Sequence, residues 1–305
     1  MNRFCELVGV RRPLQMAAMT RVATPTLVAA VANAGALGMM AIGRSSVEES
    51  QRQVEEIRGL TNGAVGAGFI VPFLQHSTFD LIVDHVDVYE LFYGWPDATL
   101  VRSDKIVGWQ VGSVDEAKAA VDAGCRYVIA QGVEAGGHVR GTVPLHELLP
   151  AVRAAVDVPV VASGGIGSAK QVRTFMAMGA DAVRIGTRFL AASEADTHPV
   201  YLDLLIAATS GDTEHTGLFA VGWPDAPVRV LACAAAAARA AGPNPVGELE
   251  GRALPRFGTT PPNRATTGQI EAMALYAGIS VGDISEPQPA ADIIDELLGV
   301  ETSRS

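Results

Sequence analysis

The chain has 305 residues, of which 49% are hydrophobic and 18% charged, and its formal net charge is −10. This composition supplies the apolar material for a buried core, in one large domain or in two ordinary ones. The acidic balance, with no segment rich in lysine and arginine, argues against a nucleic acid or an anionic membrane as partner.

The cysteines and the N-terminus bear on the cellular compartment. Cys5, Cys125 and Cys233 are few and widely separated, which indicates reduced thiols and argues against a disulfide framework or a metal site. The N-terminus lacks a basic head followed by a continuous apolar stretch, so no signal peptide is expected. The alanine-rich run 230–241 is too short to span a bilayer. We therefore expect a soluble, cytoplasmic protein.

Short apolar runs alternate with helix-like segments through roughly the first 210 residues. The predicted strands are 13–19, 36–42, 64–71, 86–93, 105–111, 126–130, 158–162 and 182–185. The predicted helices are 27–34, 46–59, 79–85, 114–123, 145–156 and 168–178. Helix starts carry capping signals, with Thr24 before Pro25 and a capping box from Ser113 to Glu116. Eight such units predict an α/β fold, a closed (β/α)8 TIM barrel.

The C-terminal third has a different pattern. Residues 209–268 contain Gly-Trp-Pro and two further proline-rich stretches, which favour an irregular insertion that covers the barrel mouth. The segments 269–277 and 290–298 are predicted to be helices that pack on the outside of the barrel. The predicted organisation is therefore a barrel made of 1–208 and 269–305, with a lid or substrate region at 209–268.

A loop with four glycines follows the sixth predicted strand, in the run Gln131-Gly-Val-Glu-Ala-Gly-Gly-His-Val-Arg-Gly141. Barrel enzymes place catalytic groups in such loops. The imidazole of His138 titrates near neutrality, so it can take a proton α to an electron-withdrawing group or donate to a developing anion. The alternative is a surface or packing histidine. Glu134 either caps or orients the loop or is solvated.

Two glycine loops end the seventh and eighth predicted strands, at Ser163-Gly-Gly-Ile166 and at Gly186-Thr187. Neighbouring loops at the C-terminal face of a barrel can hold a phosphate with backbone N–H groups, and Thr187 can add a hydroxyl. The alternative is that the glycines only form tight turns. The sequence has no Gly-x-Gly-x-x-Gly after its first strand and no P-loop, which argues against a Rossmann cofactor and an ATPase.

Five motifs together resemble the nitronate monooxygenase family, and the flavin-dependent enoyl-ACP reductases share most of them. They are Met16-Ala-Ala-Met19, Ala32-Asn-Ala-Gly-Ala-Leu-Gly38, Ala130-Gln-Gly-Val-Glu-Ala-Gly-Gly-His138, Ser163-Gly-Gly-Ile166 and Gly186-Thr-Arg-Phe189. The resemblance implies a TIM barrel that holds non-covalent FMN at its C-terminal mouth.

Site residues follow from the resemblance, position by position. It implies that His138 is catalytic. The residues that would hold the phosphate are Gly164, Gly165, Gly186 and Thr187. Those that would line the isoalloxazine ring are Ala17, Ala18 and Met19. Those that would hydrogen-bond the ring or the ribityl chain are Gln110 and Gln131. The loop backbone would pass close to the flavin at Gly136 and Gly137.

The chain departs from the family pattern near the ring and the substrate. Met16–Ala18 lacks the usual glutamine and proline, Gly68 replaces an asparagine, and Gln110 replaces a lysine found in many members. The predicted function is the FMN-dependent oxidation of alkyl nitronates by O2 to carbonyl compounds and nitrite, and a homodimer is one option for its assembly. The alternatives are an NAD(P)H-dependent enoyl-thioester reductase and a non-catalytic flavin-binding protein. Phe92, Tyr93 and Trp95 form a pocket wall or pack as bulk.

Overall fold

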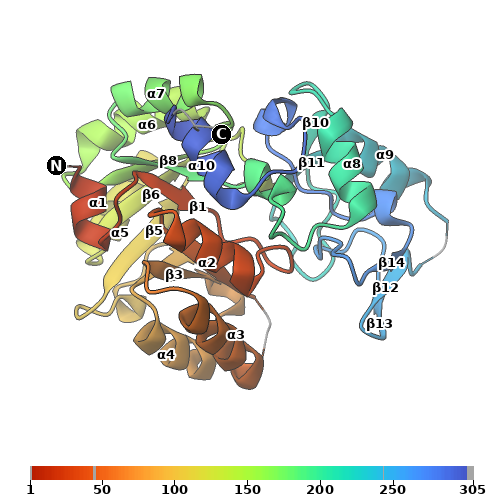
Figure 1. Cartoon of the computed structure of the whole chain (residues 1–305), viewed down its shortest axis with the longest axis horizontal. Coiled ribbons are helices and arrows are strands. Elements are labelled where there is room, and N and C mark those ends of the chain that lie inside the picture. The colour runs from red at the N-terminus through yellow and green to blue at the C-terminus, as the bar shows by residue number, and fades with distance from the viewer. Residues whose placement is uncertain (1, 44–45, 243, 301–305) are drawn as a thin grey trace, which may run out of the picture.

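Eight parallel strands form a barrel in the computed structural model, which describes residues 2–43, 46–242 and 244–300 (Figure 1). The barrel strands are β1 (Leu14–Met16), β2 (Gly38–Ile42), β3 (Val65–Ile70), β4 (Val88–Phe92), β5 (Ile106–Val111), β6 (Tyr127–Gln131), β8 (Val160–Ser163) and β9 (Ala182–Ile185). Their order is β1-β9-β8-β6-β5-β4-β3-β2. A parallel bridge between Gln15 and Leu37 joins β1 to the start of β2 and closes the sheet. The predicted TIM barrel is confirmed.

The outer helices are those that the capping signals and the 3.6-residue period predict. They are α2 (Pro25–Asn33), α3 (Val47–Leu60), α4 (His76–His85), α5 (Val114–Asp122), α6 (Leu145–Ala155) and α7 (Ala169–Ala177). The Thr24 side chain accepts from the N–H of Leu27, and the Ser113 side chain accepts from Glu116. The C-terminal helix α10 (Ala290–Leu298) packs on α2 and α7, as expected for a helix on the barrel's outside.

The interior of the barrel is apolar at one end and polar at the other. An additional helix, α1 (Arg3–Val8), plugs the N-terminal end, where Phe4 meets the ring of Tyr127 edge-on at 5.6 Å. Alternate residues of a barrel strand face inward. Along β4 the inward positions change from Val88 to Glu90, and along β9 from Ala182 to Arg184. The closed apolar end leaves the C-terminal end free for a site.

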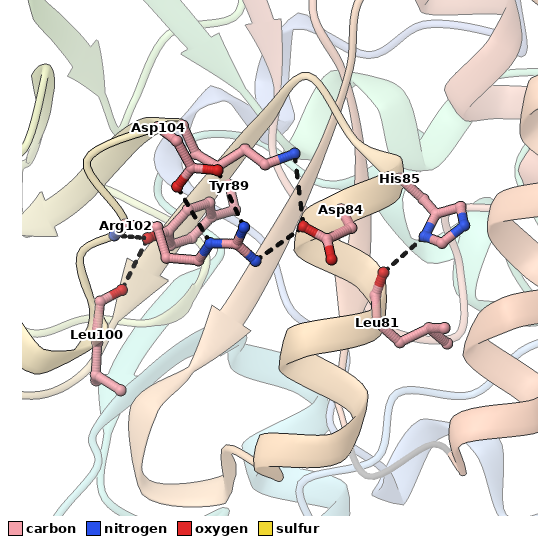
Figure 2. A network of polar contacts seen from close by, with 8 residues as sticks. Leu81, Asp84, His85, Tyr89, Leu100, Arg102 and Asp104 are labelled. Atoms are coloured by element: carbon pink, nitrogen blue, oxygen red, sulfur yellow. Dashed lines mark hydrogen bonds and ion pairs between the residues drawn. The ribbon is translucent and has the colours of Figure 1, made fainter.

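The connection between β4 and β5 contains only the short turn η2 (Ala98–Leu100) where the barrel pattern would put an α-helix. Polar contacts hold it instead (Figure 2). Arg102 pairs with Asp84 on α4 at 2.8 Å and with Asp104 at 3.0 Å. Tyr89 in β4 donates its hydroxyl to the carbonyl of Leu100 and accepts from the N–H of Arg102. Burial raises the pKa of Tyr89 to about 12, so it stays a neutral donor.

Residues 209–268, called the lid region below, are more regular than predicted. They contain β10 (Thr213–Thr216), β11 (Val228–Leu231), α9 (Ala232–Ala240), β12 (Gly247–Leu249), β13 (Arg252–Leu254) and β14 (Thr267–Gly268). One small sheet has the order β10-β11-β7, in which β7 (Gly137–His138) comes from the loop after β6. The other has the order β13-β12-β14. Figure 1 shows these elements gathered on one side of the barrel, beside α8 (Pro199–Ala207).

The prediction of a helix at 269–277 is wrong. The segment contains only the 3-10 turn η4 (Ile270–Ala272), and its remainder is extended. The extended part bonds to the lid region: Leu231 donates its N–H to the carbonyl of Leu275, and Ala277 donates to Arg229. Pairing with a distant strand therefore replaces the local helical bonds that the apolar run could also have made. No helix among the described residues is long and apolar enough to cross a membrane.

Candidate active site

A cavity of about 590 Å³ opens at the C-terminal ends of the barrel strands and is lined by barrel loops and by the lid region. Every residue that the sequence assigned to the site lines it. They are Ala17, Ala18, Met19, Gln110, Gln131, Gly136, Gly137, His138, Gly164, Gly165, Gly186 and Thr187. The lid region adds Trp223, Leu249 and Leu254, among others. The structure therefore brings all the predicted positions to one cavity, and their individual roles remain predictions.

The loop after β8 presents free backbone donors to this cavity. Gly164 and Gly165 have φ angles of 113° and 68°, which L side chains rarely adopt. The N–H groups of Gly164, Gly165 and Ile166 bond to no acceptor in the described parts of the chain. Thr187 accepts from the N–H of Gly278 at 3.0 Å, so its hydroxyl hydrogen stays available. Successive free N–H groups in such a turn form a concave site for an anion, which fits a phosphate.

The glycines of the loop after β6 differ in their surroundings. A Cβ on Gly136 would lie 2.5 Å from the nitrogen of Gly278 and 2.7 Å from the carbonyl carbon of Ala277. Gly136 is thus required where this loop packs on the segment after the lid region. A Cβ on Gly137 would meet nothing within 4 Å. Glycine is favoured there only by the backbone, whose φ of +75° is one that L side chains rarely adopt. Close passage of a flavin at these glycines stays a prediction.

Two of the departures from the family pattern lie against each other. A Cβ on Gly68, within β3, would lie only 2.8 Å from the Cβ of Ala18. The loop after β1 is held on its other side, where Ala17 donates its N–H to the carbonyl of Ile185 at 2.7 Å. The methyl group of Ala18 therefore occupies space that a side chain at position 68 would need, and the two changes are sterically complementary.

The floor of the cavity contains a buried ion pair that the sequence analysis missed. Arg184 lies 2.8 Å from Glu90 and donates to the side-chain oxygen of Gln110 at 2.6 Å. Tyr127 and Gln15 donate to the other oxygen of Glu90. Arg184 is 7% exposed and Glu90 2% exposed, so removal of either side chain would leave the charge of the other buried and unpaired. A charged residue in the middle of each of two short apolar strands was the signal that could have revealed the pair.

The two predicted glutamines are used differently. The amide nitrogen of Gln110 has no partner among the described residues, so it can donate into the cavity. Gln131 donates its amide nitrogen to the carbonyl of His138 at 2.9 Å, and its oxygen accepts from the N–H of Arg140 at 3.2 Å. Gln131 therefore shapes the loop that carries His138, a role that the sequence did not indicate.

Glu134 caps a helix. Its two carboxylate oxygens accept from the N–H of Leu145 at 3.1 and 3.0 Å, at the start of α6. Its carbonyl also accepts from Ile279. A negative charge at a helix N-terminus is favourable, and the capping role proposed for Glu134 is confirmed.

His138 lies in β7, opposite Val228 of β11. Its ring stacks on Trp223 with the centroids 3.9 Å apart and the planes at 28°. Tyr93 contacts it edge-on at 6.2 Å, and Tyr276 is tilted against it at 5.7 Å. The Nε2 atom is buried and has no hydrogen-bond partner in the described residues. Burial lowers the pKa of His138 to about 4, so the imidazole is neutral at pH 7.

The aromatic wall differs from the predicted one. Phe92 lines the cavity, and Tyr93 lies behind His138. Trp95 is 59% exposed and lies outside the cavity lining, so it forms no part of the wall. Trp223 and Tyr276 take its place. The sequence analysis singled out neither of them, because the Gly222-Trp-Pro224 motif indicated only a loop and Tyr276 lies in the segment that was predicted as an outer helix.

A sequence model of the nitronate monooxygenase family matches residues 2–101 and 93–299. A probable nitronate monooxygenase of Staphylococcus aureus is 27% identical over 270 residues, which cover 72% of this chain and 76% of that protein. The nitronate monooxygenase of Pseudomonas aeruginosa is 29% identical over 259 residues, which cover 67% of this chain and 73% of that protein.

Solved structures extend the likeness to nearly the whole chain. FabK of Thermotoga maritima has a TM-score of 0.80 and 28% identity, and the match covers 98% of this chain and 95% of FabK. A nitroalkane oxidase of Streptomyces ansochromogenes has a TM-score of 0.78 and 26% identity, with 97% of each chain covered.

Proposed function

Because this chain belongs to the nitronate monooxygenase family and is a flavin-dependent oxidoreductase, we propose that it binds FMN and oxidises alkyl nitronates with O2. The products are a carbonyl compound and nitrite. The observation that carries the proposal is the neutral imidazole of His138, which lines the same cavity as the free N–H groups of Gly164 and Gly165. His138 is thus an uncharged base on the wall of the cavity that would hold the ligand.

The residues around the cavity fit FMN. The free N–H groups of the Gly164-Gly165 turn and the hydroxyl of Thr187 would hold the phosphate. The amide nitrogen of Gln110 would donate to a polar edge of the ring, near the positive charge of Arg184. Met19 would contact an apolar part of the ring. When bound there, FMN would supply the redox chemistry between the nitronate and O2.

The protein's own part is to position the substrate and to manage one proton. Burial lowers the pKa of His138 to about 4, so the imidazole is unprotonated at neutral pH and one of its ring nitrogens can accept the Cα proton of a nitroalkane. The electron pair of that C–H bond then stays on the nitronate. With a nitronate as substrate, the ring N–H of the neutral imidazole would donate a hydrogen bond to an oxygen of the anion. The surrounding aromatic rings exclude water from this contact.

The second candidate function is NAD(P)H-dependent reduction of an enoyl thioester. It is favoured by the structural likeness to FabK of T. maritima, which extends over 98% of this chain. His138 would then lie near the thioester carbonyl.

The proposal is tested by measuring O2 consumption and nitrite release with a small alkyl nitronate after reconstitution with FMN. Replacing His138 by alanine should leave FMN bound and lower kcat/KM by roughly 10²- to 10⁴-fold, the usual contribution of a positioned acid or base. The matched control is His146→Ala, whose side chain is 64% exposed on α6 and which should keep full activity. Unchanged turnover in His138→Ala would remove His138 from the mechanism, and absence of nitrite from the wild-type protein would reject the function.

A further inference from the structure

We propose that Trp223 of the lid region is a positioning residue for His138, and that its stacked indole fixes the orientation of the imidazole at the wall of the cavity. The inference rests on the proposed function, in which His138 is the residue that contacts the substrate. The lid region then takes part in catalysis, because the orientation of the His138 side chain depends on Trp223, which the lid region supplies.

The imidazole of His138 has no polar group to orient it. Catalytic histidines commonly have one ring nitrogen held by a carboxylate or a backbone carbonyl, which sets the tautomer and the ring angle. Here neither ring nitrogen has a hydrogen-bond partner among the described residues. The backbone of His138 is fixed by β7, but β7 does not fix the side-chain torsions. Ring contacts are therefore what remains to hold the imidazole.

Trp223 makes the closest of these contacts. Its centroid lies 3.9 Å from that of His138 at an interplanar angle of 28°, a stacked arrangement. The other two rings, Tyr93 at 6.2 Å and Tyr276 at 5.7 Å, touch the imidazole at steep angles. A stacked face restricts rotation of the imidazole out of its plane, whereas edge contacts define its lateral position. The indole is thus the platform on which the imidazole lies.

Trp223 is itself held firmly between the barrel and the lid region. Phe73, in the loop after β3, meets it edge-on at 4.9 Å, and Tyr93, after β4, does so at 4.6 Å. The backbone N–H of Trp223 donates to the carbonyl of Ala220 at 3.0 Å. Tyr93 also donates its hydroxyl to the carbonyl of Asp225, two residues beyond Trp223. With 6% exposure, the indole is a fixed surface and not a mobile flap.

The other titratable groups near His138 stay unchanged around neutrality. Burial raises the pKa of Tyr93 and of Tyr276 above the ordinary tyrosine value, so both phenols remain neutral. Arg140 lies over the ring of Tyr93 at 5.5 Å and is paired with Glu116, and Arg229 on β11 donates to the carbonyl of Val133. The protonation of His138 is therefore governed by its burial, to which the indole contributes one whole face.

The test compares Trp223→Leu, which removes the stacking face but keeps apolar bulk, with Trp223→Phe, which keeps a face. Trp95→Leu is the matched control, since Trp95 is exposed outside the cavity. In FMN-loaded protein, Trp223→Leu should lower kcat by roughly 10²-fold, the size expected for a misplaced catalytic group, with the flavin retained. Trp223→Phe should recover most of the loss, and Trp95→Leu should change nothing.

Two further measurements separate positioning from general damage. Adding Trp223→Leu to His138→Ala should cause no further loss of kcat, because the indole acts through the imidazole. NMR titration of His138 should show its pKa rising towards the ordinary histidine value in Trp223→Leu, as water reaches the ring. The titration needs no substrate, so it tests this inference even if the wild-type protein proves inactive on nitronates. An unshifted titration, or losses from the two substitutions that simply add, would overturn the role assigned to Trp223.

Discussion

His138 is a buried histidine that is held by aromatic rings and is neutral because of its burial. A neutral imidazole at the wall of the cavity can accept a proton from a substrate without first losing one to solvent. The same burial has a thermodynamic consequence, since protonation of the ring must compete with folding. A histidine whose pKa is lowered in the folded state stabilises the fold less as the pH falls.

The pH dependence of stability should reveal this histidine. Above the unfolded pKa of 6.5 the ring is neutral in both states, and its full contribution to stability is present. As the pH falls from 6.5 towards about 4, the unfolded chain takes up a proton that the folded chain refuses. The free energy of unfolding therefore decreases, by roughly 3 kcal/mol over the whole interval.

Urea unfolding at pH 7 and at pH 5, compared between the wild type and His138→Asn, measures this contribution. The variant should lose less stability than the wild type between the two pH values, because asparagine does not titrate. Other groups titrate in both proteins and cancel in the difference. Equal losses in the two proteins would mean that His138 is accessible to protons in the folded state.

At the scale of elements, the loop from β6 to β7 connects the barrel to the lid region. Gln131 and Glu134 hold its two halves, the first through the backbone at His138 and Arg140 and the second through the N-terminus of α6. Gly136 allows the loop to lie directly against Gly278. The loop is thus a packed structural part, although its glycines suggest flexibility.

Adjacent glycines in this loop should respond differently to alanine. Gly136→Ala places a Cβ 2.5 Å from a backbone nitrogen and should cost roughly 3 kcal/mol, at the upper end of overpacking penalties. Gly137→Ala has open space and only a positive φ, so it should cost roughly 1 kcal/mol. Urea unfolding of both variants at one pH provides the measurement. A Gly137→Ala variant that is the less stable of the two would contradict the packing described for this loop.

The sequence predicted the elements whose signals are local. Short apolar runs located the eight barrel strands to within three residues at each end, and caps such as Ser113 located the helix starts. Features that depend on distant partners were missed. The segment 269–277 is extended because it bonds to β11, and β7 exists because Gly137 and His138 pair with the same strand. Nothing in the local period of either segment encodes a partner elsewhere in the chain.

The site was predicted in a similar, partial way. Motif resemblance located the cavity residues from Ala17 to Thr187, because glycines and one histidine at strand ends are visible in the sequence. The pair of Arg184 and Glu90 depends on strands that face each other across the barrel, and the stack of Trp223 on His138 depends on how the lid region docks. Both are properties of the assembled fold.

At the scale of the whole molecule, a barrel closed at its N-terminal end and a lid region at its C-terminal end enclose a cavity of about 590 Å³, within the usual size range of cofactor and substrate sites. The anion site, the polar floor and the histidine all line that cavity and come from different elements: the loop after β8, the strands β4 and β9, and β7. This division fits an enzyme in which the barrel holds the flavin and the lid region completes the substrate side. A cavity of this kind could admit either electron donor, a nitronate or a reduced nicotinamide.

Anaerobic stopped-flow reduction of the FMN-loaded protein tests the central claim most directly, because it asks which donor gives electrons to the flavin. Mixing with a small alkyl nitronate should bleach the visible flavin absorbance rapidly, and mixing with NADH or NADPH should leave it nearly unchanged. His138→Ala should bleach more slowly with the nitronate while its flavin spectrum stays the same before mixing. Rapid bleaching by a nicotinamide and none by the nitronate would contradict the proposed function and favour the enoyl-thioester reductase.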